Sequence, residues 1–509
     1  MRFADTPLVE GVDPIDCVDH PESLVPALRP AFLAAGEARH NLDRLFEPGT
    51  FAITTGQQPG LFTGPLYTVY KALSAAALAQ SLEAEWHRPV VPVFWLANDD
   101  HDYTEARGTS WLNLEGELVR GELSEREAEA PLTPMYRFLL GQEVERLLER
   151  FAADQPVGSH REETVEWLSK HYRSDATMGG AFSGAMAELL GRFGVVCFDS
   201  THGAAKVAMA PRIISVVQDA AVIYEKLAAE RDALLERQHT TSVIVAPGAT
   251  LAFLEDDAGR DRIMVDGGGY VTRRAGKTYD LADLQEIAAH EPTRLSPNVL
   301  LRPVLESALL PTVAYVAGPG EMSYLPLCAP IYQHLGVHQQ TPVARWSGLA
   351  VEPRVDRVLR KFGATLDDLA VAGRGLERRV VSDRMPARLV EGIATLRSAM
   401  ETGYRVVQEG AVEIDPTLER LVGAAHGRAR AELDRVERKA EQHLRRREVI
   451  ELAQIERARV AVRPEGAPQE RVLSVPGFLA RYGPSFLDEA FGQVSAWYGR
   501  ALVSRTSTS

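Results

Sequence analysis

Short, mostly apolar runs recur along the first two thirds of the chain. The clearest is 90–97, Val-Val-Pro-Val-Phe-Trp-Leu-Ala, and further runs lie at 51–55, 194–199, 242–245 and 311–317. A short apolar run of this kind is typical of a strand buried on both faces of a sheet. Because helical patterns lie between the runs, the sequence predicts an α/β fold with a doubly wound parallel sheet.

The pattern changes after about residue 352. Apolar residues then repeat at four-three spacing, first from Leu389 to Val407 and again from Leu418 to Ile455, with many charged residues between them. Two long amphipathic helices joined near Pro416 would form an antiparallel coiled-coil hairpin. A seam this narrow does not fit a globular core, so we expect the hairpin to protrude or to pair with a partner.

These patterns predict an interrupted core and a helical arm. The core is expected over 1–351, with a mostly helical insertion near 121–190 and a smaller insertion near 251–295 that contains a β-hairpin turning at 266–269. The arm is expected over 352–462. The aromatic-rich segment 463–509 is expected to pack back on the core.

Composition excludes several classes of protein. The 509 residues include 56 Lys and Arg against 70 Asp and Glu, a formal charge of −14 that argues against nucleic-acid binding. No apolar run approaches the ~18 residues of a membrane span, and the first residues lack a signal-peptide layout. Three scattered cysteines exclude a disulfide framework and a CxxC zinc site, and they favour the reducing cytoplasm.

Lysine and asparagine are scarce in this arginine-rich chain. Only seven lysines and four asparagines occur. Because arginine does not replace the compact charge of lysine at every site, a retained lysine is slightly enriched for specific roles.

The first candidate site follows the strand at 51–55. A loop with three glycines and two prolines opens a helix here, at the strand end where open α/β sheets bind ligands. Glycines admit a ligand to the backbone, and a helix N-terminus attracts an anion. Lys71 could reach a phosphate, or it could simply be solvated. The candidate binding residues are Thr55, Gly56, Gln57, Gln58, Gly60, Gly64, Tyr67 and Lys71.

The second candidate site is the acidic stretch that follows the strand at 90–97. It contains Asp100, His101 and Asp102, preceded by Asn98 and Asp99 and followed by Glu105. Crowded carboxylates are unfavourable unless a positive group is near. The stretch could hold Mg²⁺ or Zn²⁺, act as a general base or bind a substrate ammonium. Alternatively it is a polar strand exit in which Asp102 caps a helix.

The third candidate site surrounds the strand at 311–317. Asn298 and Arg302 precede the strand, and Gly318, Gly320, Glu321 and Tyr324 follow it. Arg302 could hold an anionic group or form a salt bridge at the edge of the core. Glu321 could bind an amine or complement a helix N-terminus, and Tyr324 could pack or stack.

Together these stretches resemble one known family. The runs TGQQPGLFTGPLYTVYKALSA, VPVFWLANDDHDYTEA, LSPNVLLRPVLESALLPTVAYVAGPGEMSYL and RVLSVPGFLARYGPSFLDEAF are similar to signatures of the BshC family, the cysteine ligases of bacillithiol biosynthesis. The resemblance covers most of 51–350 and 471–491. It implies a Rossmann-like core with inserted segments, related in architecture to class I aminoacyl-tRNA synthetases, and a coiled-coil arm that forms a homodimer.

The resemblance also implies a reaction, in which L-cysteine is joined to glucosaminyl-malate. By analogy, ATP with Mg²⁺ would activate the cysteine carboxylate and the glucosamine amine would attack it, with no tightly bound cofactor. In this interpretation His101 deprotonates the amine and is itself oriented by Asp100 or Asp102. Arg302 holds a malate carboxylate. The first loop would cradle the nucleotide or the sugar.

Three other interpretations remain open from the sequence. One is a synthetase-like nucleotidyl-transferase that acts on another amino acid. Another is a metal-dependent hydrolase that uses Asp100, His101 and Asp102. The third is a coiled-coil scaffold without catalysis, against which the three polar loops at strand ends argue.

Overall fold

The computed structural model describes residues 1–9, 12–13, 15–17, 24–241, 243–371 and 373–506. It divides into two compact units. One unit consists of Arg2–Ala350 together with Gln469–Ser509, and the other of Val351–Pro468 together with Met1. The core unit is therefore built from two separate lengths of chain, with the arm unit between them in sequence.

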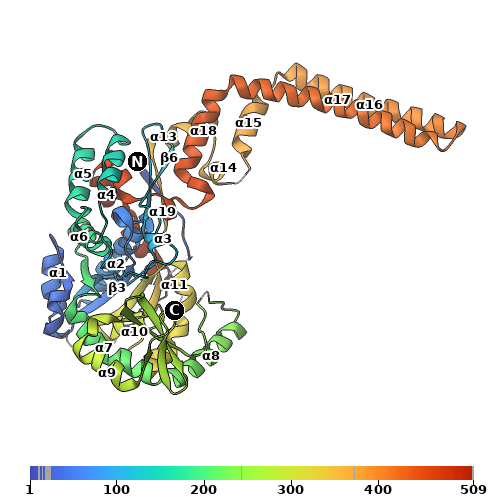
Figure 1. Ribbon diagram of the computed structural model, residues 1–509. Helices are drawn as coiled ribbons and strands as arrows, with labels where there is room; N and C mark the ends of the chain where they lie inside the picture. The colour runs from blue at the N-terminus through green and yellow to red at the C-terminus, as the bar shows by residue number, and fades with distance from the viewer. Residues whose placement is uncertain (10–11, 14, 18–23, 242, 372, 507–509) are drawn as a thin grey trace. The chain divides into compact units, whose positions relative to one another are not determined.

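A six-stranded sheet forms the centre of the core unit (Figure 1). Its neighbours run parallel except at one edge, where β2 pairs antiparallel with β7. Along the chain, β4 and β7 are added on one side of β3, and β13 and β14 on the other, so the strand order reverses between β3 and β13. The predicted doubly wound α/β core is confirmed. In sheet order the strands are β14 (Thr341–Ala344), β13 (Thr312–Ala317), β3 (Phe51–Gln57), β4 (Val90–Leu96), β7 (Val196–Asp199) and β2 (Phe32–Leu33).

Helices cover both faces of the sheet because its central strands are apolar on both sides. Every residue of β4 is buried. Val93 and Trp95 belong to a core cluster shared with α7 (Gly203–Gln218). Phe94, which alternates with them, faces Phe182 of α6 (Met178–Leu190), with ring centroids 6.4 Å apart. The connection from β3 to β4 is the buried helix α2 (Leu66–Trp86).

One expected strand is wrong. Residue 242 lies outside the described residues, and 243–245 form no strand. Ile244 is 87% exposed, whereas Val245 is buried. An apolar run becomes a strand only when a neighbouring strand pairs with it, and this segment instead lies along the cavity described below.

The first insertion lies between β4 and β7 and has a hydrophobic cluster of its own, which includes Trp111, Phe151 and Leu168. It also contains a short hairpin that the sequence pattern did not reveal. Its elements are α3 (Tyr103–Ala106), β5 (Gly108–Leu112), β6 (Leu118–Glu122), α4 (Glu143–Ala153) and α5 (Ser159–His171).

The second insertion is an antiparallel sheet in the order β11-β10-β9-β8-β12. The predicted hairpin is confirmed, since Gly269 of β10 pairs with Asp266 of β9. The sheet also takes in strand β12, which leads back to the core. Its elements are β8 (Ala249–Asp256), β9 (Gly259–Asp266), β10 (Gly269–Thr272), β11 (Thr278–Tyr279), α9 (Leu281–His290) and β12 (Leu295–Pro297).

The C-terminal segment returns to the core unit as α19 (Gln469–Val472), α20 (Val475–Tyr482) and α21 (Ser485–Thr506). Its first residue joins the end of the first length of core chain. The side chain of Gln469 accepts a hydrogen bond from the backbone N–H of Ala350 at 2.9 Å and donates one to the Ala350 carbonyl oxygen at 3.0 Å.

The arm unit contains the predicted coiled-coil hairpin, formed by α16 (Ala387–Ile414) and α17 (Leu418–Arg447), which lie side by side in Figure 1. Tyr404 stacks on His426 across the pair, with ring centroids 4.8 Å apart. The second helix ends earlier than the pattern suggested, and α18 (Val449–Val462) follows after Glu448. The remaining helices of the unit are α13 (Pro353–Phe362), α14 (Leu366–Ala370) and α15 (Gly375–Asp383).

Among the described helices, none is by itself long and apolar enough to cross a membrane. The pair α7 and α8 (Ala220–Glu236) passes that test only when taken together, and it is bent by 79° at the junction. All three cysteines are free: Cys197 and Cys328 are buried and Cys17 is exposed.

Candidate functional site

A cavity of about 650 Å³ lies at the carboxyl ends of β3, β4 and β13, where the strand order reverses. Its volume is within the range of small-molecule sites. The three stretches chosen from the sequence meet here, although they are far apart along the chain. The predicted site residues that line the cavity are Gly56, Gln57, Gln58, Tyr67, Lys71, Asp100, His101, Asp102, Asn298, Arg302, Gly318, Gly320, Glu321 and Tyr324.

The other three predicted residues, Thr55, Gly60 and Gly64, shape the loop before α2. The Thr55 hydroxyl donates to the carbonyl oxygen of Val316 at 2.8 Å, which ties β3 to β13. Gly64 has a φ of +71°, a conformation that side chains disfavour, and a Cβ at Gly60 would lie 2.9 Å from the Gly64 Cα.

Lys71 is held inside the wall of the cavity rather than presented to it. Its ammonium is almost fully buried and donates to the Gly56 carbonyl oxygen at 2.5 Å and to Oε2 of Glu321 at 2.7 Å. Burial lowers the pKa of Lys71, and the Glu321 carboxylate opposes that shift. Glu321 also accepts from the backbone N–H of Gly318 at 2.7 Å at the start of α11 (Pro319–Tyr324). Its negative charge therefore matches Lys71 and complements a helix N-terminus at once.

Arg302 is likewise paired with a carboxylate inside the protein. It begins α10 (Arg302–Leu309), donates to Oε2 of Glu306 at 2.7 Å and donates to the Tyr315 hydroxyl at 3.1 Å. Burial raises the pKa of the fully buried Glu306 to about 7, against the opposing charge of Arg302. Of the two alternatives for Arg302, the structure shows the salt bridge.

Asn298 and Tyr324 also have structural contacts. Oδ1 of Asn298 accepts from the backbone N–H groups of Leu300 and Leu301, both at 3.0 Å, and so stabilises the turn before α10. Tyr324 is buried and packs in the core cluster beside the cavity.

The acidic stretch folds into a tight turn. Asp100 accepts from the backbone N–H of Asp102 at 2.8 Å, and Asp102 accepts from that of Glu105 at 3.1 Å, which makes Asp102 the N-cap of α3. The capping interpretation of Asp102 is thus confirmed.

His101 is oriented by an arginine rather than by these aspartates. Its Nδ1 lies 3.3 Å from a guanidinium nitrogen of Arg260, a residue of β9. Because a guanidinium only donates, Nδ1 accepts and the neutral ring carries its hydrogen on Nε2. Burial and the charge of Arg260 lower the pKa of His101, and Asp100 and Asp102 oppose this shift. The lowered pKa favours the neutral ring, whose hydrogen then lies on Nε2.

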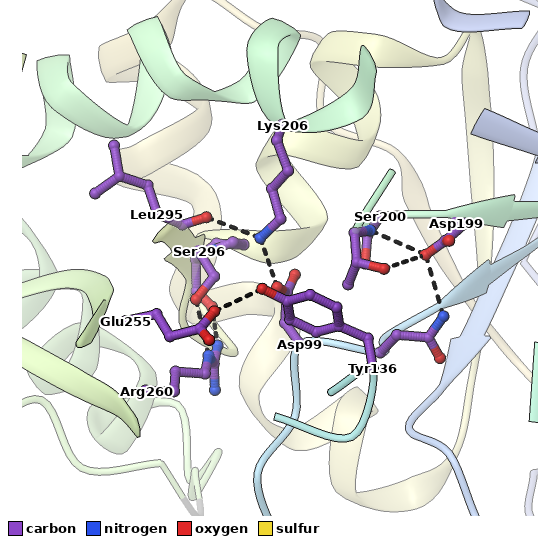
Figure 2. Close-up of polar contacts among 12 residues, drawn as sticks. Asp99, Tyr136, Asp199, Ser200, Lys206, Glu255, Arg260, Leu295 and Ser296 are labelled. Carbon is purple, nitrogen blue, oxygen red and sulfur yellow. Dashed lines mark hydrogen bonds and ion pairs between the residues drawn. The ribbon is translucent and has the colours of Figure 1, made fainter. Parts of the chain in front are cut away.

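Figure 2 shows a buried ion pair between Lys206 and Asp99, together with the contacts of Arg260. Lys206, on α7, donates to Oδ1 of Asp99 at 2.5 Å and to the Leu295 carbonyl oxygen at 2.8 Å. Arg260 donates to the Ser296 hydroxyl at 2.8 Å and to the carbonyl oxygen of Pro297 at 2.6 Å. The two cations thus fasten β12 to the loop that carries His101.

Sequence reasoning missed several charged residues of this region. Lys206 is one of seven lysines, and that scarcity was an available signal. Arg471 begins the C-terminal signature quoted above. Arg260 and Arg262 carried no signal, since arginine is common in this chain and their place depends on the register of the second sheet.

Two cavity arginines stand apart from the matched pairs. Within the described part of the chain, no carboxylate lies within ion-pairing distance of Arg262 or Arg471, and each is near an aromatic ring, that of Phe253 and that of Tyr67 respectively. Of the cations that line the cavity, these two arginines are therefore the best placed to bind an anionic group of a ligand.

No group of three or more His, Cys, Asp or Glu side chains among the described residues is arranged to hold a metal ion. Asp100 and Asp102 use carboxylate oxygens to accept from their own backbone turn, and His101 turns toward Arg260. This geometry gives no support to the hydrolase interpretation.

Two family models match the chain in succession. The N-terminal Rossmann-like domain of bacillithiol biosynthesis BshC matches residues 20–345, and the C-terminal coiled-coil domain of BshC matches residues 348–500. The chain belongs to the BshC family. The resemblance drawn from the four signatures is confirmed, and both parts of the BshC architecture are present.

Curated relatives agree over nearly the full length. A protein of Heliobacterium modesticaldum is 32% identical over 91% of this chain and 84% of its own, and one of Symbiobacterium thermophilum is 31% identical over 92% and 87%. One of Prosthecochloris aestuarii is 29% identical over 88% and 81%. All three carry the name "Putative cysteine ligase BshC".

Proposed function

We propose that this protein is a ligase that joins L-cysteine to glucosaminyl-malate in bacillithiol biosynthesis, using ATP to activate the cysteine carboxylate. The observation that carries the proposal is the convergence of all four BshC signatures on one cavity at the reversal point of the sheet. That position is where open α/β folds bind nucleotides and small substrates.

The charges of the cavity fit such substrates. ATP and malate are anions, whereas the protein has a formal charge of −14, so local cations must attract them. Lys71 and Arg302 are already paired with carboxylates. We therefore assign the anionic groups of the substrates chiefly to Arg262, and we assign to Arg302 a role in fixing the cavity wall.

ATP would convert the cysteine carboxylate to an acyl adenylate with release of pyrophosphate, and attack by the amine would form the carbon–nitrogen bond and release AMP. This attack requires that the amine lose a proton and that the acyl oxygen be stabilised while it gains negative charge. We propose that the Nε2–H of His101 donates to that oxygen, because its Nδ1 is occupied by Arg260. A carboxylate of the same loop, Asp100 or Asp102, would accept the proton of the amine. This division revises the role of general base that the sequence suggested for His101.

Mg²⁺ would arrive with ATP and be held mainly by phosphate oxygens and water, as is usual for this ion. The carboxylates of Asp100 and Asp102 are oxygen ligands of the type it accepts. We further propose that the arm pairs two copies of the chain and that the protein acts in the cytoplasm without a tightly bound cofactor.

The direct test is reconstitution. Purified protein given L-cysteine, glucosaminyl-malate and ATP is expected to form bacillithiol, detected by thiol labelling and mass spectrometry. A strain lacking the gene is expected to accumulate glucosaminyl-malate. ATP–pyrophosphate exchange stimulated by another amino acid but not by cysteine would favour the nucleotidyl-transferase alternative instead.

A further inference from the structure

Two opposite charges face the same cavity without forming an ion pair. Arg471 comes from α19 and Glu105 from α3, and both are exposed lining residues of the cavity. Tyr67 is close to both: the Arg471 guanidinium lies 6.0 Å from its ring centroid, and the Glu105 carboxylate raises its pKa. Among the described residues, Glu105 accepts a side-chain hydrogen bond from Gln58 at 2.6 Å.

Arg471 is positioned by a clamp next to it in sequence. Glu470 forms a buried ion pair with Arg345, in which one guanidinium nitrogen donates to the carboxylate at 2.9 Å. Gln469 is joined to Ala350 by two hydrogen bonds. The backbone before Arg471 is therefore fixed, and binding a ligand would require little further ordering there.

The charges are near enough to influence each other. Burial and the negative charge of Asp102 raise the pKa of Glu105, and Arg471 partly opposes that rise. The two groups also act in opposite directions on the pKa of Tyr67, which burial raises to about 12. A simple anion at Arg471 would meet the charge of Glu105, and a simple cation at Glu105 would meet that of Arg471.

A molecule with both charges satisfies both residues. We propose that Arg471 and Glu105 form a subsite for the zwitterionic head of an α-amino acid, with the carboxylate at Arg471 and the ammonium at Glu105. Arg262 differs from Arg471, because burial and the positive charge of Arg273 lower the pKa of Arg262. With a cation rather than a carboxylate beside it, Arg262 suits a ligand group that is only anionic. The inference rests on the proposed function in taking L-cysteine as the amino acid.

Binding of three related thiols to the full-length protein tests the subsite. L-Cysteine has both charged groups, cysteamine lacks the carboxylate and 3-mercaptopropionate lacks the ammonium. Calorimetric titration is expected to show L-cysteine binding about tenfold or more tightly than either analogue, since each charge-assisted contact contributes an energy of that order.

The variants separate the two contacts. Arg471→Gln is expected to abolish the preference for L-cysteine over cysteamine, and Glu105→Gln the preference over 3-mercaptopropionate. Arg262→Gln is the charge-matched control for Arg471→Gln: it removes one positive charge from the same cavity and should leave the preference for L-cysteine over cysteamine unchanged. Thermal melting of each variant verifies that it is folded.

The outcomes distinguish the subsite from the reaction. Wild-type protein without either preference, or Arg471→Gln and Glu105→Gln variants that retain both, would overturn the subsite even if the wild-type protein forms bacillithiol. Preferences that respond as expected, in a protein that joins no cysteine to glucosaminyl-malate, would support the subsite and overturn the proposed function.

Discussion

The ammonium of Lys206 lies 2.5 Å from Oδ1 of Asp99, and the lysine side chain is 1% exposed. Asp99 directly precedes the turn that holds Asp100, His101 and Asp102. The same ammonium also donates to the Leu295 carbonyl oxygen of β12. One buried cation thus connects the loop that follows β4 with the smaller sheet, to which Arg260 belongs.

Replacing Lys206 by methionine should therefore destabilise the core strongly. Loss of one partner leaves the Asp99 charge buried without compensation, which costs about 3–5 kcal/mol. Denaturant unfolding measures the loss, and the double variant Lys206→Met with Asp99→Leu is expected to recover much of it. Lys226→Met, at an exposed lysine of α8, is the control; a similar effect in both single variants would refute the role of the ion pair.

Replacing Arg260 should change the titration of His101. Burial and the Arg260 charge both lower the pKa of this ring. Arg260→Gln removes the second cause, so the pKa should rise and more of the ring should be protonated near neutral pH. Nuclear magnetic resonance of the ring protons, assigned with His101→Gln, measures the shift. The expected position of the ring hydrogen on Nε2 is read from nitrogen shifts of the wild-type protein; a hydrogen on Nδ1 would contradict the proposed donor role.

Glu306 should make stability decrease as pH rises. Its pKa is raised from 4.5 to about 7, so the folded state binds the proton more tightly than the unfolded state does. This contribution is fully present below the unfolded value and is lost as pH rises through the folded one. Relative to Glu306→Gln, the wild type should lose roughly 2–3 kcal/mol of unfolding free energy between about pH 5 and 8. Parallel curves for the two proteins would exclude this titration.

The arm is expected to hold two copies together through exposed apolar side chains of α16. Leu396 and Val407 are 50% and 56% exposed. They are eleven residues apart, close to three full turns, and so lie on one face. Replacing both with arginine should shift the protein from dimer to monomer in sedimentation experiments while helicity is retained. Glu401→Arg, on the same helix, should leave the dimer intact.

The sequence predicted the cavity better than the contacts inside it. Polar residues that follow buried parallel strands must gather at one edge of the sheet, so the loops beginning near Gln57, Asn98 and Gly318 could be placed together without coordinates. Which charge faces which could not be predicted, because it depends on packing between distant segments. Lys71 was expected either to reach a phosphate or to be solvated, yet the carboxylate of Glu321, 250 positions away, pairs with it inside the protein.

The strand expected at 243–245 does not form, although the composition of this run suits a strand. A strand also requires a neighbouring strand that is free to pair with it, and the sequence pattern of the run itself does not show whether such a neighbour exists. The contact of Arg260 with His101 could not be predicted either, because it depends on how β9 pairs with β8.

The clamp of Arg345 on Glu470 has a consequence for the order of synthesis. One partner precedes the arm in sequence and the other follows it, so a ribosome must complete the whole of 351–468 before the second can emerge. Until then the nascent core has its sheet, its acidic turn and its glycine loop, but it lacks the wall formed by α19. The binding site is therefore finished last, and a growing chain cannot close around substrate before its arm has been made.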